Sequence, residues 1–390
     1  MKDYFIKMWQ LGLREIGLFA RRPMFLCCML LVPLVSIFLF PGLMKSGLPT
    51  DLPCGLVDDD NTATTRSIVR ILNSMQYTDL GHKYANFHDA RKAVQRGEIY
   101  GFFYIPRGVT DDALASRQPK VSFYTNDSYY IAGSLLMKDL KVVSELAGMA
   151  VTKSTLTAKG IPESMLMGIV QPIVIETHCI SNPYLNYSVY LSNLIIPGMI
   201  FLLAMLFTAY TLGLEWKYNT VKEYYNQAGG SITVALVGKF WPQTLLFSLM
   251  IVFADVIFYK YLGYPCQVPI LRMMAFGILG VIASECIAIF FYGTFRQMRL
   301  SMSACSLFAV VQFSMCGFTF PSTAMSPVLQ LLGNIFPLRH YYLIYCNQAL
   351  NGYNLAYVWP SLVALLVMLL LPPMVIKSMR YAMLNIEYKP

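Results

Sequence analysis

Long apolar runs, interrupted by one polar insert, dominate the pattern of the chain. The first run begins at Pro23, polar sequence follows from Lys45 to Ser188, and further apolar runs then follow in quick succession. A helix needs roughly 20 apolar residues to cross the hydrocarbon core of a bilayer. We therefore predict six transmembrane helices, at Pro23–Pro41, Tyr190–Gly213, Lys239–Leu262, Leu271–Phe295, Leu300–Phe320 and Tyr357–Ile376.

Composition and charge support this interpretation and set an orientation. Hydrophobic residues make up 56% of the chain and charged residues 13%, as in an integral membrane protein. Cytoplasmic loops retain Lys and Arg, and most basic residues outside the insert fall on one side if the N-terminus is cytoplasmic. The net charge of +9 is then a topology signal and does not indicate nucleic-acid binding. We expect both termini in the cytoplasm and the insert outside it.

The expected fold is an α-helical integral membrane protein with an extracytoplasmic α/β domain inserted between transmembrane helices 1 and 2. Its parts are a cytoplasmic interfacial helix at 1–22, transmembrane helix 1 at 23–44, the α/β domain at 45–188, transmembrane helices 2–6 at 189–376 and a cytoplasmic tail at 377–390.

The residues before the first span have two different faces at helical spacing. The polar positions are Asp3, Lys7, Gln10, Arg14 and Arg21. The apolar positions are Phe5, Met8, Trp9, Leu13, Ile16 and Phe19, with Glu15 at the flank. Such a helix is expected to lie in the cytoplasmic membrane interface and to enter the membrane at Arg21-Arg22-Pro23. Packing of this helix on other protein is the alternative.

The insert alternates between strand and helix patterns. The predicted strands are Cys54–Val57, Tyr77–Tyr84, the apolar run after Gly97, Val121–Tyr124 and Val174–Ile180. The predicted helices run from Thr64 to Met75, from His88 to Gly97 and from Ile131 to Leu156. The run Asp58-Asp59-Asp60 lacks the spaced ligands and the glycine of a calcium loop, so it indicates a solvated turn.

Two carboxylates fall inside predicted spans, Asp255 in the third and Glu285 in the fourth. A charge at the centre of a membrane helix costs about 2.5 to 3.5 kcal/mol on insertion scales, so both side chains should face a polar interior. A role in a substrate or proton path and a structural hydrogen bond between helices are both open for Glu285. Asp255 could instead reach the membrane interface.

Cysteine and histidine spacing indicates no metal site, and no catalytic constellation is evident. Cys54 lies in the first predicted strand of the insert and Cys179 in the last. Because an α/β domain can place these strands side by side in an oxidising compartment, we predict a disulfide between them.

The order of these pieces resembles the permease subunits of ATP-binding-cassette (ABC) type-2 exporters, also called type V exporters, with a large extracytoplasmic domain. Nearly the whole chain takes part in this resemblance. It is carried by Arg21-Arg22-Pro23, Gly97 with Ile105-Pro106, Asn182-Pro183, Glu215–Glu223 with Gly238-Lys239, Gly317–Pro321 and Pro337–Tyr342.

The resemblance implies a coupling helix at 214–238 that sits on a nucleotide-binding subunit. The residues expected to couple to the ATPase are Glu215, Lys217, Thr220, Lys222 and Glu223. Asn219 replaces the glycine of the family pattern, and Gly229-Gly230 stands where a proline turn is common. A solvated loop whose charges serve solubility is the alternative.

The resemblance also implies two short re-entrant helices near 321–345 that form an outer gate. Its candidate residues are Phe318, Phe320, Pro321 and Pro337. Broken backbone at membrane depth survives only where protein or water satisfies it. The aromatic residues of this segment could equally form an interfacial belt.

The chain has no phosphate-binding loop of its own. Gly238-Lys239 has Thr233 at the first glycine position and Phe240 after the lysine, so the motif fails at both ends. We expect no cofactor on this chain, with ATP and Mg²⁺ bound by a separate ABC ATPase subunit. A second permease protomer, a periplasmic adaptor and an outer-membrane channel are further expected partners.

The expected function is export of a drug-like or lipid-like substrate across a bacterial inner membrane. Two alternatives remain at this point. One is a membrane-anchored receptor or scaffold whose outer domain binds a ligand without transport, and the other is an export permease of the polysaccharide type.

Overall fold

The chain forms two compact units, which are described separately. One unit is Leu48–His178, and the other combines the segments before and after it. The computed structural model describes residues 2–115, 117, 119–158, 160, 162, 165, 168–169, 176, 178, 181–182 and 185–385.

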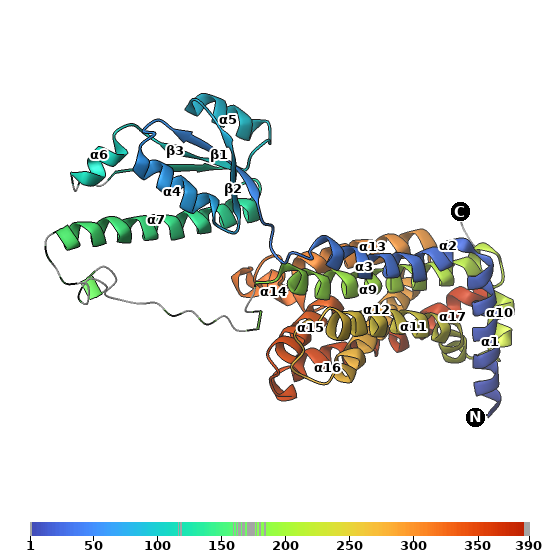
Figure 1. The fold of residues 1–390 in the computed structure, drawn as a ribbon. Coiled ribbons are helices and arrows are strands. Elements are labelled where there is room, and N and C mark those ends of the chain that lie inside the picture. Colours follow the sequence, from blue (N-terminus) through green and yellow to red (C-terminus); the bar gives the residue numbers. More distant parts are fainter. Residues whose placement is uncertain are drawn as a thin grey trace. The chain divides into compact units, whose positions relative to one another are not determined.

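The larger unit is a helical bundle (Figure 1). Its described part contains six helices long and apolar enough to cross a membrane, at Pro23–Leu43, Tyr187–Lys217, Ile232–Tyr261, Ile270–Phe295, Met298–Met315 and Trp359–Asn385. Their number and order confirm the sequence prediction. In element terms they are α2 (Pro23–Leu26) with α3 (Val32–Leu43), α9 (Tyr187–Lys217), α11 (Ile232–Val256), α12 (Ile270–Phe295), α13 (Met298–Met315), and α16 (Trp359–Met368) with α17 (Leu371–Asn385).

Three predicted boundaries differ most from the structure. Helix α11 begins at Ile232 and contains Lys239, whose charge had placed the predicted start too late. Helix α13 ends at Met315 and not at Phe320, because Gly317 turns the chain with a positive φ of 91°. Helix α17 continues to Asn385, so the tail predicted from residue 377 is helical to that point.

The N-terminal helix α1 (Lys2–Arg21), the short helix α10 (Val221–Gln227) and α17 pack together at one end of the bundle (Figure 1). Leu11, Tyr224 and Met379 belong to their shared apolar core. The turn between α12 and α13 joins the same end, since Arg296 Nε donates to Ser378 Oγ of α17 at 2.8 Å. The sequence-predicted cytoplasmic flanks of the spans therefore gather at one end.

Two short helices, α14 (Pro327–Gly333) and α15 (Pro337–Tyr345), stand between the fifth and sixth spans. Helix α15 packs among α9, α12, α13 and α16. Tyr341 meets Phe201 of α9 edge-on with ring centroids 5.6 Å apart, and Tyr345 Oη donates to the carbonyl of Val189 at 3.1 Å. Short helices are thus present at the predicted position, and α15 is embedded in the bundle.

The smaller unit is built on a four-stranded sheet with the order β2-β1-β3-β4. The strands are β1 (Leu52–Asp58), β2 (Thr78–Lys83), β3 (Gly101–Ile105) and β4 (Ser122–Thr125). Strands β2 and β3 pair parallel to β1, and β4 pairs antiparallel to β3. The first four predicted strands are confirmed. The fifth, Val174–Ile180, falls mostly outside the described residues.

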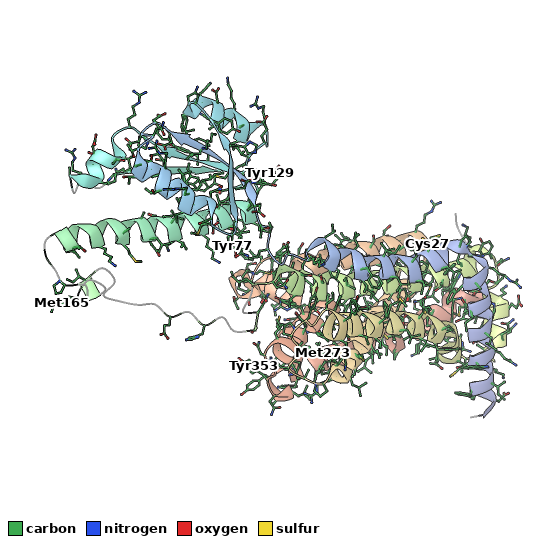
Figure 2. The ribbon with its side chains drawn as sticks, viewed as in Figure 1. Cys27, Tyr77, Tyr129, Met165, Met273 and Tyr353 are labelled. Carbon is green, nitrogen blue, oxygen red and sulfur yellow. The ribbon has the colours of Figure 1, made fainter. Side chains whose placement is uncertain are left out.

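Four helices of the described part accompany the sheet. They are α4 (Ala63–Asn73), α5 (Phe87–Gln95), α6 (Val109–Leu114) and α7 (Tyr130–Ala158). All but α6, which was not predicted, lie close to the predicted positions. Thr62 caps α4 in a capping box with Thr65, and Gly97 turns the chain after α5 with a φ of 74°. Asp139 of α7 accepts hydrogen bonds from the backbone of Tyr77, which is labelled in Figure 2, and from Thr78 Oγ1, each at 2.9 Å. The α/β class of the insert is therefore correct.

The two chain segments that flank the insert meet in the larger unit. Tyr187 N donates to the carbonyl of Gly47 at 3.1 Å, directly after the first span and at the start of the second. Asn186 caps α9 by accepting from the backbone of Ser188 at 2.9 Å. The insert thus leaves and rejoins the bundle at neighbouring points, as predicted. The Pro183 of the predicted Asn182-Pro183 motif lies outside the described residues.

Candidate coupling site

The site begins where α9 ends. Tyr218 N bonds back to the carbonyl of Leu214 at 2.9 Å, and Asn219 takes a positive φ of 56°, which stops the helix. The backbone N of Thr220 then donates to the carbonyl of Glu215 at 2.9 Å, and α10 follows. Asn tolerates the left-handed conformation better than most residues, which explains how Asn219 replaces the expected glycine.

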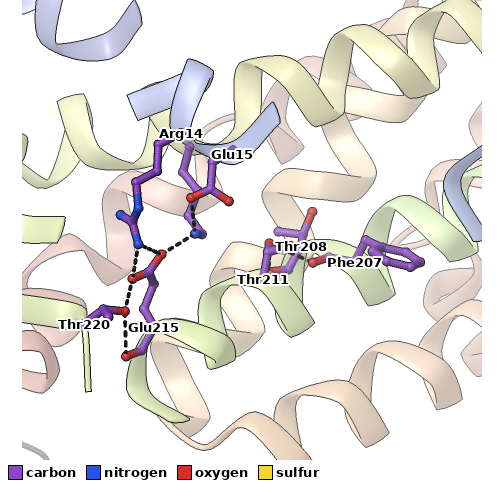
Figure 3. A network of polar contacts seen from close by, with 8 residues as sticks. Arg14, Glu15, Phe207, Thr208, Thr211, Glu215 and Thr220 are labelled. Carbon is purple, nitrogen blue, oxygen red and sulfur yellow. Dashed lines mark hydrogen bonds and ion pairs between the residues drawn. The ribbon is translucent and has the colours of Figure 1, made fainter. Parts of the chain in front are cut away.

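Four charged side chains from three helices meet behind this turn (Figure 3). Lys239 Nζ of α11 lies 2.7 Å from Glu215 Oε1 of α9 and 2.8 Å from Glu15 Oε1 of α1. Arg14 Nη2 of α1 donates to both carboxylate oxygens of Glu215 at 2.9 Å. Thr220 Oγ1 adds a bond to Glu215 Oε2 at 2.5 Å. We call Arg14, Glu15, Glu215 and Lys239 the charge network.

Three members of the charge network are buried, Arg14 is partly exposed, and the four charges balance. The side chains of Glu15 and Lys239 are 2% exposed and that of Glu215 is 3% exposed. Two acids and two bases leave no net charge, and a buried ion is tolerated only when it is paired and hydrogen-bonded. Burial alone would lower the pKa of Arg14, but the Glu215 carboxylate raises it above its ordinary value. Arg14 therefore stays charged at any pH relevant to the protein.

Helix α10 contacts the charge network through one buried aromatic residue. The Tyr224 ring centroid lies 5.2 Å from Lys239 Nζ and 5.8 Å from Arg14 Cζ. Both distances lie in the range of cation–π attraction. Burial, followed by the nearby Glu15 and Glu215 carboxylates, raises the pKa of Tyr224 well above its ordinary value. A displacement of α10 would thus bear directly on side chains of α1 and α11.

The opposite face of α10 is exposed. Lys222 and Glu223 point away from the buried core, together with Asn226 and Gln227. Gln227 Nε2 donates to Glu223 Oε1 at 3.1 Å, which orders this face. Lys217, at the end of α9, is exposed as well. These five residues are called the α10 face, and among them are three of the five predicted coupling residues.

The other two predicted coupling residues do not lie on this face. Glu215 and Thr220 lie on the inner side of the turn between α9 and α10. Glu215 is buried by Arg14 and Lys239, and Trp216 is buried against Tyr292 with ring centroids 5.2 Å apart. Thr220 is half-buried because its hydroxyl bonds to Glu215.

Sequence reasoning missed the partners of Glu215. The sequence placed Glu15 at the flank of the amphipathic pattern, and it placed Lys239 at a helix start and in the Gly238-Lys239 pair, without a partner for either charge. The available signal was their charge: a lysine within an apolar helix and an acid near the apolar face of another each require a partner of opposite charge. A cavity of about 220 Å³, bordered by Arg14, Glu215 and Lys239, leaves space beside the charge network.

A second polar cluster lies among the spans. Gln243 Nε2 and Thr244 Oγ1 of α11 donate to the two oxygens of Glu285 at 2.9 and 2.5 Å. Gln243 also donates to Thr208 Oγ1 of α9 at 2.7 Å. The structural hydrogen bond that was one sequence-based reading of Glu285 is therefore present. Asp255 is buried as well, and its Oδ2 has no hydrogen-bond partner among the described residues.

Residues 23–372 match the profile of the family described as ABC-2 family transporter protein. The chain belongs to this family. No curated protein and no solved structure matched the chain.

Membership in the ABC-2 family defines the general role of the chain. It is the multi-pass membrane permease subunit of an ABC transporter, and this family of transport subunits lacks the ATPase domain. Such a permease works with an ATPase partner. The charge network and the α10 face can therefore be considered as parts of a transporter.

The predicted gate residues of the permease are divided between a turn and a helix start. Phe318 stacks on Tyr190 of α9 with centroids 4.3 Å apart, and Tyr190 Oη donates to the Phe318 carbonyl at 2.7 Å. Phe320 is exposed, Pro321 precedes a single 3₁₀ turn, and Pro337 opens α15. The structure brings Phe318 against the second span and leaves Phe320 apart from that contact.

The predicted disulfide of the permease stays a prediction. Cys54 lies in β1 and is fully buried, whereas Cys179 falls outside the described residues. Burial raises the pKa of the Cys54 thiol, so this cysteine is a poor nucleophile in the folded insert.

Proposed function

We propose that this permease exports a hydrophobic or amphipathic substrate, drug-like or lipid-like, and that a separate ATPase drives it by pressing on the α10 face. ATP and Mg²⁺ bind to that partner. The coupling residues in direct contact would be Lys217, Lys222 and Glu223, while Thr220 and Glu215 would transmit the displacement inside the bundle.

The observation that carries the proposal is the two-sided position of α10. Its exposed side offers polar and charged side chains for docking, and Tyr224 on its buried side lies against Lys239 and Arg14. Lys239 belongs to the third span, Glu215 to the second, and Arg14 to the N-terminal helix. A rigid contact chain therefore leads from the docking surface to two spans and to α1.

Charge distribution supports the orientation within this proposal. Basic residues cluster at the end of the bundle that carries α1, α10 and the turn at Arg296. With that end in the cytoplasm, positive charge is retained inside, and the insert lies on the outer side. The exposed apolar residues Phe5, Leu13 and Ile16 of α1 would then lie in the inner membrane interface.

The remaining partners follow from the family and from this orientation. Two permease protomers, identical or different, would form a path between them, with α14, α15 and the Phe318 turn as its outer gate. A periplasmic adaptor and an outer-membrane channel would receive the substrate beyond a bacterial inner membrane.

The proposal is tested by co-purification with the ATPase encoded nearest the gene. Lys222→Glu combined with Glu223→Lys exchanges the positive and the negative side chain on the α10 face and leaves the buried charge network unchanged. We expect this double variant to lose the complex and its ATP turnover. Lys260→Glu, at an exposed position in the last turn of the third span, is the matched control and should retain both.

Other outcomes separate the alternatives. A wild-type chain that forms no complex with an ATPase would support a receptor or scaffold whose outer domain binds a ligand. A complex whose turnover responds to glycan-linked lipids and to no smaller amphiphile would support a permease of the polysaccharide type.

A further inference from the structure

An apolar groove lies in the wall of the helical unit between α11, α12 and α17. It has a volume of about 700 Å³, which is within the range of drug-sized ligand sites. Leu245 and Val237 line it and are about half exposed, at 52% and 53%, so the groove opens to the surroundings of the bundle. Pro372 and Pro373 of α17 form its far wall.

Glu285 is the one carboxylate among the described residues that line this mostly apolar groove, and Thr244, which lies 2.5 Å from it, lines the groove as well. The lining contains no Lys, Arg, His or second acid. Gln243 Nε2 lies 2.9 Å from one carboxylate oxygen of Glu285, and Thr244 Oγ1 lies 2.5 Å from the other, so both oxygens are held in place. Glu285 forms no ion pair in the part of the chain that the structure describes.

The lining of the groove offers a second feature that suits a cation. Trp241 lines it and is held in place by stacking on Trp9 of α1, with centroids 5.0 Å apart and planes 7° from parallel. Its indole N–H donates to the carbonyl of Met8 at 3.3 Å. A fixed indole ring attracts cations more strongly than any other aromatic side chain.

We propose that this groove binds a lipophilic cation, with the apolar walls holding its hydrocarbon part and Glu285 its positive charge. The inference rests on the proposed function and names the substrate class of the permease. Charge complementarity favours this occupant over a neutral acyl chain, which would gain nothing from a carboxylate, and over an anionic lipid, which Glu285 would repel. A second copy of the chain would need a basic side chain to meet Glu285.

The test is direct binding to the purified permease in nanodiscs of neutral lipid, measured against empty nanodiscs. The probes are tetraphenylphosphonium and tetraphenylborate, which have the same shape and opposite charge. We expect saturable binding of the cation only. Glu285→Gln should weaken it at least about tenfold, which corresponds to about 1.4 kcal/mol. Asp255→Asn, which removes the other membrane carboxylate outside the groove, should leave binding unchanged.

A second pair of variants keeps the test decisive if Glu285→Gln folds poorly. Ile282→Trp retains the carboxylate and fills the groove, so it should abolish binding, while Glu285→Asp should keep most of it. Equal binding of both probes, or cation binding that neither Glu285→Gln nor Ile282→Trp changes, would overturn the proposal. The proposal would also fail if the wild-type protein bound neither probe and a monomeric variant bound both. That result would show that a second copy of the chain covers the groove.

This experiment needs no ATPase and therefore fails independently of the proposed function. Cation binding without ATPase coupling would leave the groove established and refute the coupling model. ATPase coupling without cation binding would support the coupling model and refute the proposed cation site in the groove.

Discussion

Lys239 of the third span and Glu215 of the second are joined by an ion pair of 2.7 Å in which both side chains are almost completely buried. Glu15 of α1 completes the neutralisation of Lys239 from the other side at 2.8 Å. The pair therefore ties the N-terminal helix and two spans into one element beside α10. In this account it is the element through which an ATPase moves the spans.

Removal of Lys239 should destabilise the protein strongly. Lys239→Met leaves Glu15 buried without a cation, and breaking a buried ion pair from one side costs about 3 to 5 kcal/mol. We expect a clearly lower melting temperature in detergent, and partial recovery when Glu15→Gln is added. Lys222→Met, at an exposed position, is the control. A Lys239→Met protein as stable as that control would show that the network contributes nothing.

Removal of the Tyr224 hydroxyl and removal of the whole Tyr224 ring should have different effects. Its hydroxyl has no hydrogen-bond partner among the described residues, and its ring is fully buried. Tyr224→Phe keeps the ring over Lys239 and should be neutral in stability and in coupling. Tyr224→Ala should cost roughly 3 to 5 kcal/mol and uncouple ATP turnover from transport. If Tyr224→Phe by itself uncouples ATP turnover from transport, then coupling depends on the Tyr224 hydroxyl and not on the ring.

The stacking of Trp9 on Trp241 should hold α1 against the bundle. Trp9→Ala removes a parallel pair worth about 0.5 to 1.5 kcal/mol beyond its buried area. We expect faster hydrogen exchange throughout α1 by mass spectrometry. Phe5→Ala, whose side chain is 70% exposed, should not change exchange in detergent. Identical exchange in both variants would mean that the charge network alone holds α1.

The turn at Asp60 gives the insert a defined response to acid. Asp60 Oδ2 accepts from Thr110 Oγ1 at 2.6 Å and Oδ1 from Gly108 N at 2.7 Å. The Thr110 bond is the largest cause of a pKa held below its ordinary value of 3.8. A depressed carboxyl pKa stabilises the fold above the unfolded value, and this contribution is lost as the pH falls through the folded value.

In the Asp60→Asn variant, the stability of the insert should therefore depend less on pH below about pH 4 than in wild type. Limited proteolysis of the full chain with an acid-active protease would measure it, with Asp89→Asn on the exposed surface of α5 as the control. The same pH dependence in wild type and Asp60→Asn would remove this turn from the acid response.

Hydropathy could predict the spans because each residue contributes to the free energy of membrane insertion largely independently of residues that are distant in the sequence. It misplaced the start of α11 for the same reason. Lys239 is tolerated in that helix only because Glu15, 224 positions earlier, and Glu215, 24 positions earlier, neutralise it. Partners that are this distant in sequence leave no trace in a window of neighbouring residues.

The insert was easier to predict because its signals are local. Thr62 and Gly97 mark helix boundaries through their own backbone and side-chain preferences, and the strands follow directly. The coupling residues were predicted from their order along the chain, which could not distinguish the buried Glu215 from the exposed Glu223. Which of the two side chains is buried depends on the turn between α9 and α10, which sets the face that each helix presents to the bundle.

The most direct test of the account is a crosslinking comparison between the two ends of the bundle. A photoreactive residue is placed at position 223 on the α10 face or at position 260 in the last turn of the third span, and the permease is co-expressed with its ATPase. The account predicts an ATPase adduct from position 223 and none from position 260. An adduct from position 260 alone, or from neither position in an active complex, would contradict it.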